Sequence, residues 1–206
     1  APFVSNDRKP RAAFSLPKAN PCERAMVSYL QQRGIDAQVI SQCIGMGILY
    51  ESLEYKNCVF VGRDSSGTPR SAFLRGTYGK FKADGAGSDK RYSFFIPAKE
   101  KNCPYLAVTE SPIDALSVAS LLKMQDEDWT NCTYLCLGGT APCALITFLH
   151  EHPSITQVSL CLDNDKAGLQ GMENIHKAVQ SDPKLSKRRM VIVDNPPPLF
   201  SGKDYN

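Results

Sequence analysis

The sequence predicts an α/β protein in which a small α+β subdomain is followed by a domain with a parallel sheet. From residue 105 onward, short apolar runs alternate regularly with helical segments, a pattern that calls for right-handed crossovers and a parallel sheet. Upstream of residue 105, two helical segments precede short strands separated by turns, which is typical of an antiparallel unit. The 206 residues are enough for one large domain or two small ones, each with its own core.

The N-terminal part is predicted to begin with an arm and two helices. Residues 1–17 carry three prolines and show no hydrophobic period, so we expect a linker or arm there. A helix is expected to start at Asn20-Pro21 and to end near Gly34. A second, shorter helix is expected from Asp36 to about Gly45, with Asp36 at its start.

Short strands follow the two helices, and a turn at residues 64–67 joins the first two of them. The predicted strands are residues 58–61, 71–75 and 92–96. Residues 97–104, rich in Pro, Lys and Glu, mark the expected boundary. We therefore predict an α+β subdomain over residues 18–98 and a second domain over residues 99–206.

The second domain is predicted to alternate strand and helix to its end. Its apolar runs are compact enough to be strands buried on both faces, as in a parallel sheet. The predicted strands are residues 105–108, 133–137, 157–162 and 189–193, and the predicted helices are residues 112–124, 141–150 and 166–180.

The composition is that of a soluble globular protein, with 42% hydrophobic and 22% charged residues. No apolar run approaches the roughly 20 residues that span a bilayer, and no signal-peptide pattern is visible, so a cytoplasmic location is expected. The eight cysteines include no Cys-x-x-Cys pair and are expected to be reduced and apolar in character. Because the chain opens with Ala instead of Met, we expect it to be a fragment of a longer protein.

Charge is distributed unevenly along the chain. Residues 1–104 carry 16 Lys and Arg against nine Asp and Glu, whereas residues 105–206 carry eight against 12. A basic half beside an acidic half suits a protein in which one part holds a polyanion and the other holds metal ions. Chance is the alternative explanation.

Acidic residues follow directly on two predicted strands. Glu110 and Asp114 come after the first strand, and Asp163 and Asp165 come after the third. Open parallel sheets bind ligands at this edge, and residues two apart in an extended segment point the same way, so Asp163 and Asp165 are expected to reach one ion. Oxygen ligands without His or Cys nearby favour Mg²⁺ or Mn²⁺ over zinc.

We predict Glu110, Asp163 and Asp165 as the metal ligands and Asp114, one helical turn beyond Glu110, as a further ligand or a partner of one. The alternative is that Glu110 and Asp114 only complement the dipole of a helix N-terminus.

Glycines after the second strand suggest a phosphate site. Gly138 and Gly139 precede a predicted helix, where backbone N–H groups can approach an anion. A tight turn with Thr140 as the helix N-cap is an equally good interpretation. Lys166 follows the aspartates and is expected to screen the metal site or to hold phosphate.

A basic segment interleaved with aromatic residues lies upstream. Lysine and arginine contact phosphates, and aromatic rings stack on unpaired bases, so we predict a groove for a single strand or a nucleotide. The alternative is a sheet whose edge is protected by lysines. The candidate binding residues are Arg63, Arg75, Lys80, Lys82, Lys90 and Arg91, with Phe73, Tyr78 and Phe81 among them.

The order Glu110, Asp114, Gly138-Gly139 and Asp163-Asn164-Asp165 resembles the motifs of the Toprim domain. That domain is shared by bacterial-type primases, type IA and type II topoisomerases and some nucleases. The resemblance implies a Rossmann-like parallel sheet and catalytic roles for Glu110, Asp163 and Asp165, with Glu110 as a metal ligand or general acid/base. Lys203-Asp204 resembles the last Toprim element, which implies that Asp204 completes the acidic cluster.

The N-terminal half resembles the subdomain that precedes Toprim in bacterial primases, through residues 29–35, 44–45, 58–61 and 75–76. It is also similar to Toprim proteins of plasmids and integrative elements, in which an uncharacterised domain carries a segment like residues 87–92. Arg75 and Lys90 lie in these segments and are therefore the strongest candidates for nucleic-acid contact.

Together these observations predict Mg²⁺- or Mn²⁺-dependent nucleotidyl or phosphodiester transfer on DNA, as in primer synthesis for the replication or transfer of a mobile element. The expected partners are a single-stranded DNA template, nucleoside triphosphates and other domains or replication and conjugation proteins of the same element. The alternatives are a non-catalytic module that binds single strands and a Toprim nuclease. A topoisomerase is disfavoured, because no neighbouring domain with a transesterifying tyrosine is visible.

Overall fold

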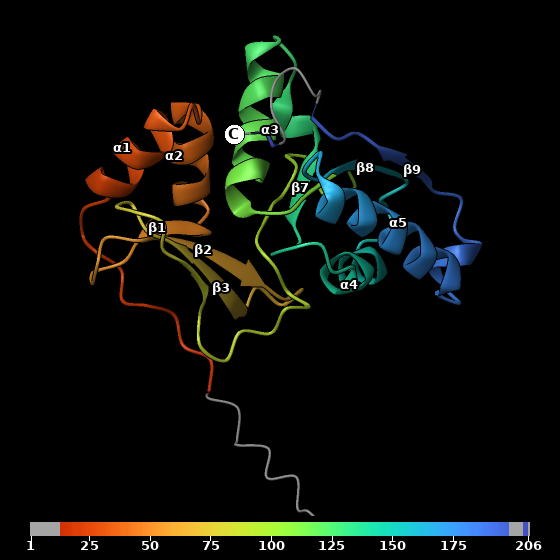
Figure 1. Ribbon diagram of the computed structural model, residues 1–206, viewed down its shortest axis with the longest axis horizontal. Coiled ribbons are helices and arrows are strands. Elements are labelled where there is room, and N and C mark those ends of the chain that lie inside the picture. The colour runs from red at the N-terminus through yellow and green to blue at the C-terminus, as the bar shows by residue number, and fades with distance from the viewer. Residues whose placement is uncertain (1–12, 198–203, 206) are drawn as a thin grey trace, which may run out of the picture.

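The computed structural model describes residues 13–197 and 204–205 and places two sheets on either side of a central helix, α3 (Figure 1). The antiparallel sheet has the order β1-β2-β3-β4, with β1 Leu49–Glu51, β2 Cys58–Arg63, β3 Pro69–Arg75 and β4 Lys82–Asp84. The second sheet has the order β5-β7-β6-β8-β9, with β5 Phe95–Ile96, β6 Tyr105–Thr109, β7 Thr133–Cys136, β8 Gln157–Cys161 and β9 Val191–Asp194. The α-helices are α1 Arg24–Gln32, α2 Ala37–Gly45, α3 Pro112–Met124, α4 Cys143–Glu151 and α5 Lys166–Ser181.

Side-chain oxygens set the starts of the first two helices. Asp36 caps α2 and accepts hydrogen bonds from the backbone N–H groups of Gln38 at 2.8 Å and Val39 at 3.4 Å. The Glu51 carboxylate, which is almost fully buried, accepts from the N–H of Met26 in the first turn of α1 at 2.8 Å. The two expected helices are confirmed, although α1 starts three residues after Pro21.

The second sheet confirms the predicted fold class. Strands β6, β7, β8 and β9 pair in parallel, and α4 and α5 cover one face while α3 covers the other. Residues alternate along β6, so that Leu106 and Val108 face α4 and α5 whereas Ala107 faces α3. Every predicted strand and helix of this half is present, with bounds that differ by at most two residues.

Residues 92–96 divide between the two sheets, so the expectation that they join the antiparallel unit is confirmed only for Phe94, which forms an antiparallel bridge with Gly62 of β2. Strand β5 pairs with β7 of the second sheet, with Phe95 opposite Leu135 and Ile96 opposite Tyr134. Phe94 and Ile96 are buried in the core shared by both parts, and this burial favours the place of β5 between the two sheets. The strands β1 and β4 were not predicted, because three residues are too few to show alternation.

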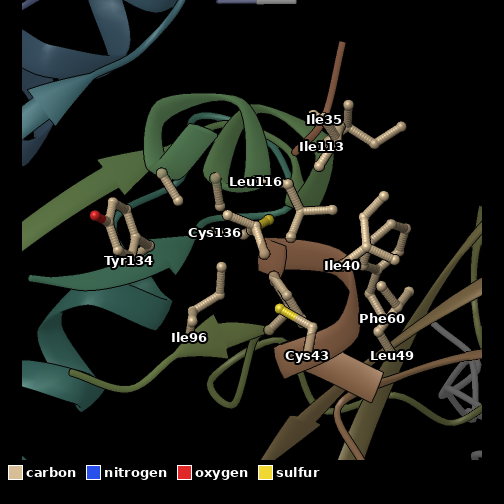
Figure 2. Close-up of a cluster of buried hydrophobic side chains, with 14 of the residues drawn as sticks. Ile35, Ile40, Cys43, Leu49, Phe60, Ile96, Ile113, Leu116, Tyr134 and Cys136 are labelled. Carbon is tan, nitrogen blue, oxygen red and sulfur yellow. The ribbon is translucent and has the colours of Figure 1, made fainter. Parts of the chain in front are cut away.

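One hydrophobic cluster joins the two parts of the molecule (Figure 2). Ile40 of α2 and Phe60 of β2 belong to the first part, and Ile113 and Leu116 of α3 and Tyr134 of β7 belong to the second. Hydrogen bonds reinforce this contact, since Ser120 of α3 accepts from the N–H of Asp36 at 3.0 Å. The shared core therefore fixes the antiparallel sheet relative to the parallel one.

All eight cysteines are free, as expected from the sequence. Most of them are buried, and burial raises the pKa of the Cys43 and Cys58 thiols to about 12. None of the described helices has the length and apolar character needed to cross a membrane.

Candidate active-site cleft

A cleft of about 440 Å³ lies between the antiparallel sheet and the carboxyl end of the parallel sheet. One wall is acidic and comes from the ends of β6 and β8, the start of α3 and the C-terminal segment. The facing wall comes from the end of α1, β3 and β4 and is mainly basic, with Asp84 as its one carboxylate. The lining residues are Arg33, Phe73, Arg75, Lys82, Ala83, Asp84, Glu110, Ser111, Ile113, Asp114, Gly138, Gly139, Asp163 and Asp204.

Glu110 lies directly after β6, and its Oε1 accepts a hydrogen bond from the backbone N–H of Asp163 at 3.2 Å. A Cβ at Gly168 of α5 would collide with the carbonyl of Asp163 and come within 2.9 Å of Glu110 Oε1, so only glycine fits there. Burial and, after it, the charges of Asp163, Asp165 and Asp114 raise the pKa of Glu110 to about 7. The site therefore holds a carboxylate under electrostatic strain.

Asp114 and Ser111 form a capping box at the start of α3. Asp114 accepts from the Ser111 N–H at 3.0 Å, and Ser111 Oγ accepts from the Asp114 N–H at 3.4 Å. Burial raises the pKa of Asp114; nearby Asp204 raises it further, and nearby Arg33 lowers it. The structure thus brings Asp204 close to Asp114, as the Toprim resemblance implies, while Lys203 lies outside the described residues.

Asp163 and Asp165 differ in their local surroundings. Asp163 lines the cleft, but the chain bends at residues 164–165 and Asp165 becomes the N-cap of α5. Its Oδ1 accepts from the N–H groups of Ala167 at 2.9 Å and Gly168 at 3.0 Å. The helix start thus takes up one carboxylate oxygen of Asp165, while the charge of Asp165 still raises the pKa of Glu110, and the expectation that the two aspartates reach one ion stays a prediction.

The cleft has the donor chemistry of a hard cation. Five carboxylates line it together with one neutral hydroxyl, and neither His nor Cys does. Within the part of the chain that the structure describes, however, no three His, Cys, Asp or Glu side chains are close enough together to hold a metal ion. The assignment of Glu110, Asp114, Asp163, Asp165 and Asp204 as ligands stays a prediction.

Gly138 and Gly139 line the cleft and have φ angles of +69° and +134°. This backbone conformation explains why both positions are glycine. The N–H of Gly139 donates to the carbonyl of Glu110 at 3.0 Å, so the turn supports the acidic wall. The alternative with Thr140 as N-cap is wrong, since α4 has Pro142 at that position without a side-chain cap. Phosphate binding at the glycines stays a prediction.

The basic wall contains Arg75 and Lys82, as predicted, and also Arg33, which the sequence analysis missed. Tyr29 supports both arginines: its hydroxyl accepts from Arg75 Nε at 3.1 Å, and the Arg33 guanidinium lies 5.9 Å from the centre of its ring. Tyr29 and Arg33 are four residues apart at the end of α1, and this spacing places both on one helix face. The four-residue spacing of Tyr29 and Arg33 is the sequence feature that could have identified Arg33 as a site residue.

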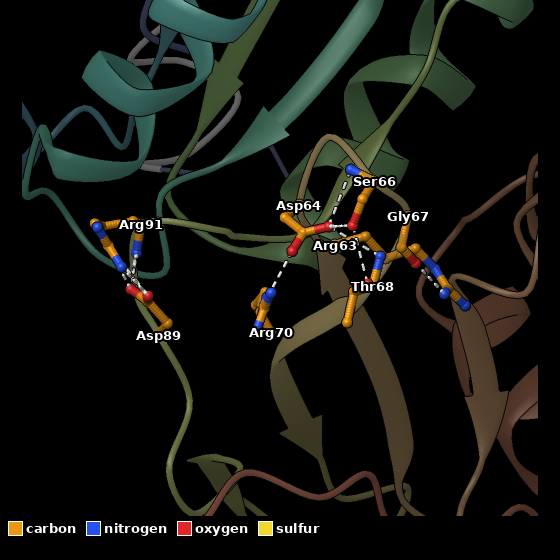
Figure 3. A network of polar contacts seen from close by, with 8 residues as sticks. All are labelled: Arg63, Asp64, Ser66, Gly67, Thr68, Arg70, Asp89 and Arg91. Atoms are coloured by element: carbon orange, nitrogen blue, oxygen red, sulfur yellow. Dashed lines mark hydrogen bonds and ion pairs between the residues drawn. The ribbon is translucent and has the colours of Figure 1, made fainter.

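The other basic candidates lie outside the cleft lining. Lys90 pairs with Asp84 at 2.7 Å on the cleft rim. Arg63 donates to the carbonyls of Gly67 and Gly47 beside the β2–β3 turn, and Arg91 pairs with Asp89 (Figure 3). Lys80 and Lys166 are exposed, the first in the loop before β4 and the second at the start of α5. Their roles in binding nucleic acid stay predictions.

Two family models match the chain. Residues 28–100 match the family described as Protein of unknown function (DUF3991), and residues 107–206 match the Toprim-like family. No curated protein sequence matches the chain.

Solved structures of DNA primases are similar in fold. The primase fragment of the bacteriophage T7 primase-helicase protein has a TM-score of 0.54 at 21% identity, over 79% of this chain and 62% of the T7 fragment. A DNA primase domain from Pseudomonas aeruginosa has a TM-score of 0.58 at 15% identity, over 91% of this chain and 68% of that domain. A DnaG primase catalytic domain bound to ssDNA has a TM-score of 0.57 at 14% identity, over 90% of this chain and 67% of that one. At these identities the likeness concerns the fold.

Proposed function

Since the chain carries a DUF3991 domain followed by a Toprim-like domain, we propose that it is a primase-like nucleotidyltransferase that synthesises primers on single-stranded DNA. The fold it shares with primase catalytic cores supports this assignment. The same two-domain arrangement supports a role in the replication or transfer of a mobile element. The other domains or replication proteins with which it would act belong to that element.

The observation that carries the proposal is the opposition of charges across the cleft. Glu110, Asp114, Asp163 and Asp204 lie on one side and Arg33, Arg75 and Lys82 on the other, where the single carboxylate, Asp84, is paired with Lys90. A nucleoside triphosphate presents phosphates to both kinds of wall, because its charge attracts arginine and lysine directly and attracts carboxylates only through cations. Charges that served only to stabilise the fold would not need to line a cleft of about 440 Å³.

Mg²⁺ or Mn²⁺, held by Glu110 and Asp163 with Asp114, Asp165 or Asp204, would neutralise phosphate oxygens. Arg33 and Arg75 would orient the triphosphate, and Lys82 would contact the phosphates of the template. Glu110 is placed as a ligand or as the acid/base that handles the proton of the attacking 3′-hydroxyl. The bond formed joins that oxygen to the α-phosphate of the incoming nucleotide, and pyrophosphate leaves.

The test is a primer-synthesis assay on single-stranded DNA with nucleoside triphosphates and either Mg²⁺ or Mn²⁺. Glu110→Gln keeps the size of the side chain and removes its charge, so product formation should fall roughly 10²-fold or more. Glu100→Gln removes an exposed charge outside the cleft and is the matched control, which should retain full activity. Both variants should bind single-stranded DNA as the unaltered protein does.

Three outcomes separate the alternatives. Metal-dependent shortening of the DNA without synthesis would identify a nuclease. Tight binding to single strands with no product under either metal would identify a binding module. Full synthesis by the Glu110→Gln variant would remove Glu110 from the chemistry.

A further inference from the structure

Exposed aromatic side chains gather at the tip of the antiparallel sheet, away from the cleft. Tyr55 is 82% exposed and Tyr78 77%, and Leu53 and Phe81 beside them are 47% and 49% exposed. The residues belong to two loops, 53–57 between β1 and β2 and 76–81 between β3 and β4. We call these four residues the stacking surface.

The two loops form one surface. Thr77 Oγ1 of the second loop donates to the carbonyl of Lys56 in the first at 3.0 Å. Gly76 brings Tyr78 and Phe81 together, since a Cβ there would lie 3.0 Å from the Tyr78 carbonyl and 3.1 Å from Phe81 Cβ. A groove of about 400 Å³ runs between the loops, lined in part by Leu53, Tyr55, Leu74 and Phe81.

Positive charge surrounds the aromatic rings. Lys18 borders the groove, Lys56 directly follows Tyr55, and Lys80 directly precedes Phe81. Glu54 is the acidic residue among them within these loops. Aromatic rings framed by lysines suit a polyanion with flat, apolar groups, which describes a single-stranded nucleic acid.

The backbone that presents Tyr55 is strained. Tyr55 and Lys56 have φ angles of +60° and +54°, a region that bulky side chains rarely adopt and that asparagine and glycine adopt easily. A turn selected only for stability would carry Asn-Gly there. Strain of this kind concentrates at functional positions, and the turn here presents an aromatic side chain to solvent against its own backbone preference.

Strand β4 connects this surface to the cleft. Lys82 lines the cleft, and the preceding Phe81 lines the groove on the opposite face of the sheet. The two positions are adjacent along an edge strand, so a single strand leaving the cleft reaches the stacking surface by passing around that edge.

We propose that the stacking surface is a second binding site for single-stranded nucleic acid, in which unpaired bases stack on Tyr55 and Tyr78 while the surrounding lysines contact phosphates. The inference deepens the proposed function and rests on it, since the strand held here would be the same template that enters the cleft. A protein partner is the competing occupant.

The test measures affinity for oligothymidylate of about 20 nucleotides by fluorescence anisotropy in low salt and EDTA. Tyr55→Asn and Tyr78→Ala should each weaken binding about 5-fold or more, whereas Tyr55→Phe and Tyr78→Phe should stay within about 2-fold. Asn favours the left-handed backbone of residue 55, so the first variant keeps its thermal stability, and a loss of affinity there is not a loss of folding.

An abasic strand of the same length separates stacking from charge attraction. The unaltered protein should prefer oligothymidylate to the abasic strand, and the double variant Tyr55→Asn, Tyr78→Ala should not. Equal affinity of the unaltered protein for both strands, or unchanged affinity in the double variant, overturns the proposal and leaves the surface to a protein partner. Because EDTA excludes catalysis, failure of primer synthesis would overturn the proposed function without altering this result.

Discussion

Glu110 is the side chain of the cleft whose pKa is the most clearly raised by its surroundings. It sits where β6 ends, takes its orientation from the backbone N–H of Asp163 and packs against Gly168. Burial and three neighbouring aspartates make its ionisation unfavourable. A cation in the cleft would relieve that repulsion, so the same arrangement that destabilises the metal-free protein favours metal binding.

Glu110→Gln is expected to stabilise the metal-free protein at pH 8 and to leave its stability unchanged near pH 4. The folded-state pKa of about 7 lies above the usual 4.5, so the folded protein binds more protons and loses stability as pH rises through this interval. Glutamine does not ionise, and its advantage at pH 8 should be about 1 kcal/mol after allowance for solvent screening of a half-buried group. Thermal unfolding of both proteins at the two pH values measures it.

Glu100→Gln serves as the control, since Glu100 is exposed and should give no difference at either pH. Added Mg²⁺ should raise the unfolding temperature of the unaltered protein at pH 8 more than that of the Glu110→Gln variant. Equal stability of variant and parent at pH 8 would contradict the strained state of Glu110.

For single residues, the sequence predicted the site correctly where the end of a strand positions a side chain. It was insufficient where the local backbone or the packing of a helix determines the position of the side chain. Glu110 and Asp163 follow β6 and β8, and the parallel sheet brings them together. The capping role of Asp165 was not foreseen, because it depends on the helix that begins at the next residue and takes one of its carboxylate oxygens. Arg33 depends on how α1 packs against the rest of the molecule, which one sequence does not reveal.

At the scale of single elements, α1 carries the basic wall into the cleft. Its Tyr29 accepts a hydrogen bond from Arg75 of β3 and lies beneath Arg33 at its own C-terminal end. Two arginines from different elements thereby share one support. The helix is thus tied to the binding side of the cleft as well as to the core.

Tyr29→Phe should weaken the binding of a nucleoside triphosphate roughly fivefold, because it frees the Arg75 side chain and keeps the ring beneath Arg33. Tyr50→Phe removes an equivalent hydrogen bond, from the Tyr50 hydroxyl to the carbonyl of Pro17 at 2.7 Å, and is the matched control. Isothermal titration with the nucleoside triphosphate measures the affinity of both variants. An equal loss of affinity in the two would mean that Tyr29 acts only on the stability of the fold.

The elements themselves were predictable where they were long. Helix α3 appears with the expected bounds, because Ser111, Pro112 and Asp114 form a recognisable start. Strand β5 was assigned to the wrong sheet, since the pattern of residues 92–96 gives burial without identifying the partner strand. The choice of partner strand depends on the shared core, and the members of that core cannot be identified from the sequence alone.

At the scale of the whole molecule, the two walls of the cleft belong to parts joined by one core (Figure 2). Helix α3 packs against α2 on one side and the parallel sheet on the other, and Lys123 at its end pairs with Asp36 of the first part at 2.7 Å. The distance between the two walls of the cleft is therefore set by the packing of this shared core. A cavity at this junction should disturb the cleft more than an equal cavity elsewhere.

Leu116→Ala and Leu145→Ala test this expectation as a pair, since both leucines are fully buried. Leu116 lies in the core that joins the two parts, and Leu145 of α4 lies in the core on the far face of the parallel sheet. Each substitution should cost about 2 to 5 kcal/mol of unfolding free energy, and fluorescence of the buried, single Trp129 follows the transition. At temperatures well below the unfolding midpoints of both variants, only Leu116→Ala should weaken oligothymidylate binding and raise the KM for nucleotides. The reason is that only this cavity lies in the core that holds the two walls of the cleft in place. Equal binding by the two variants would mean that the cleft is held by contacts other than the shared core.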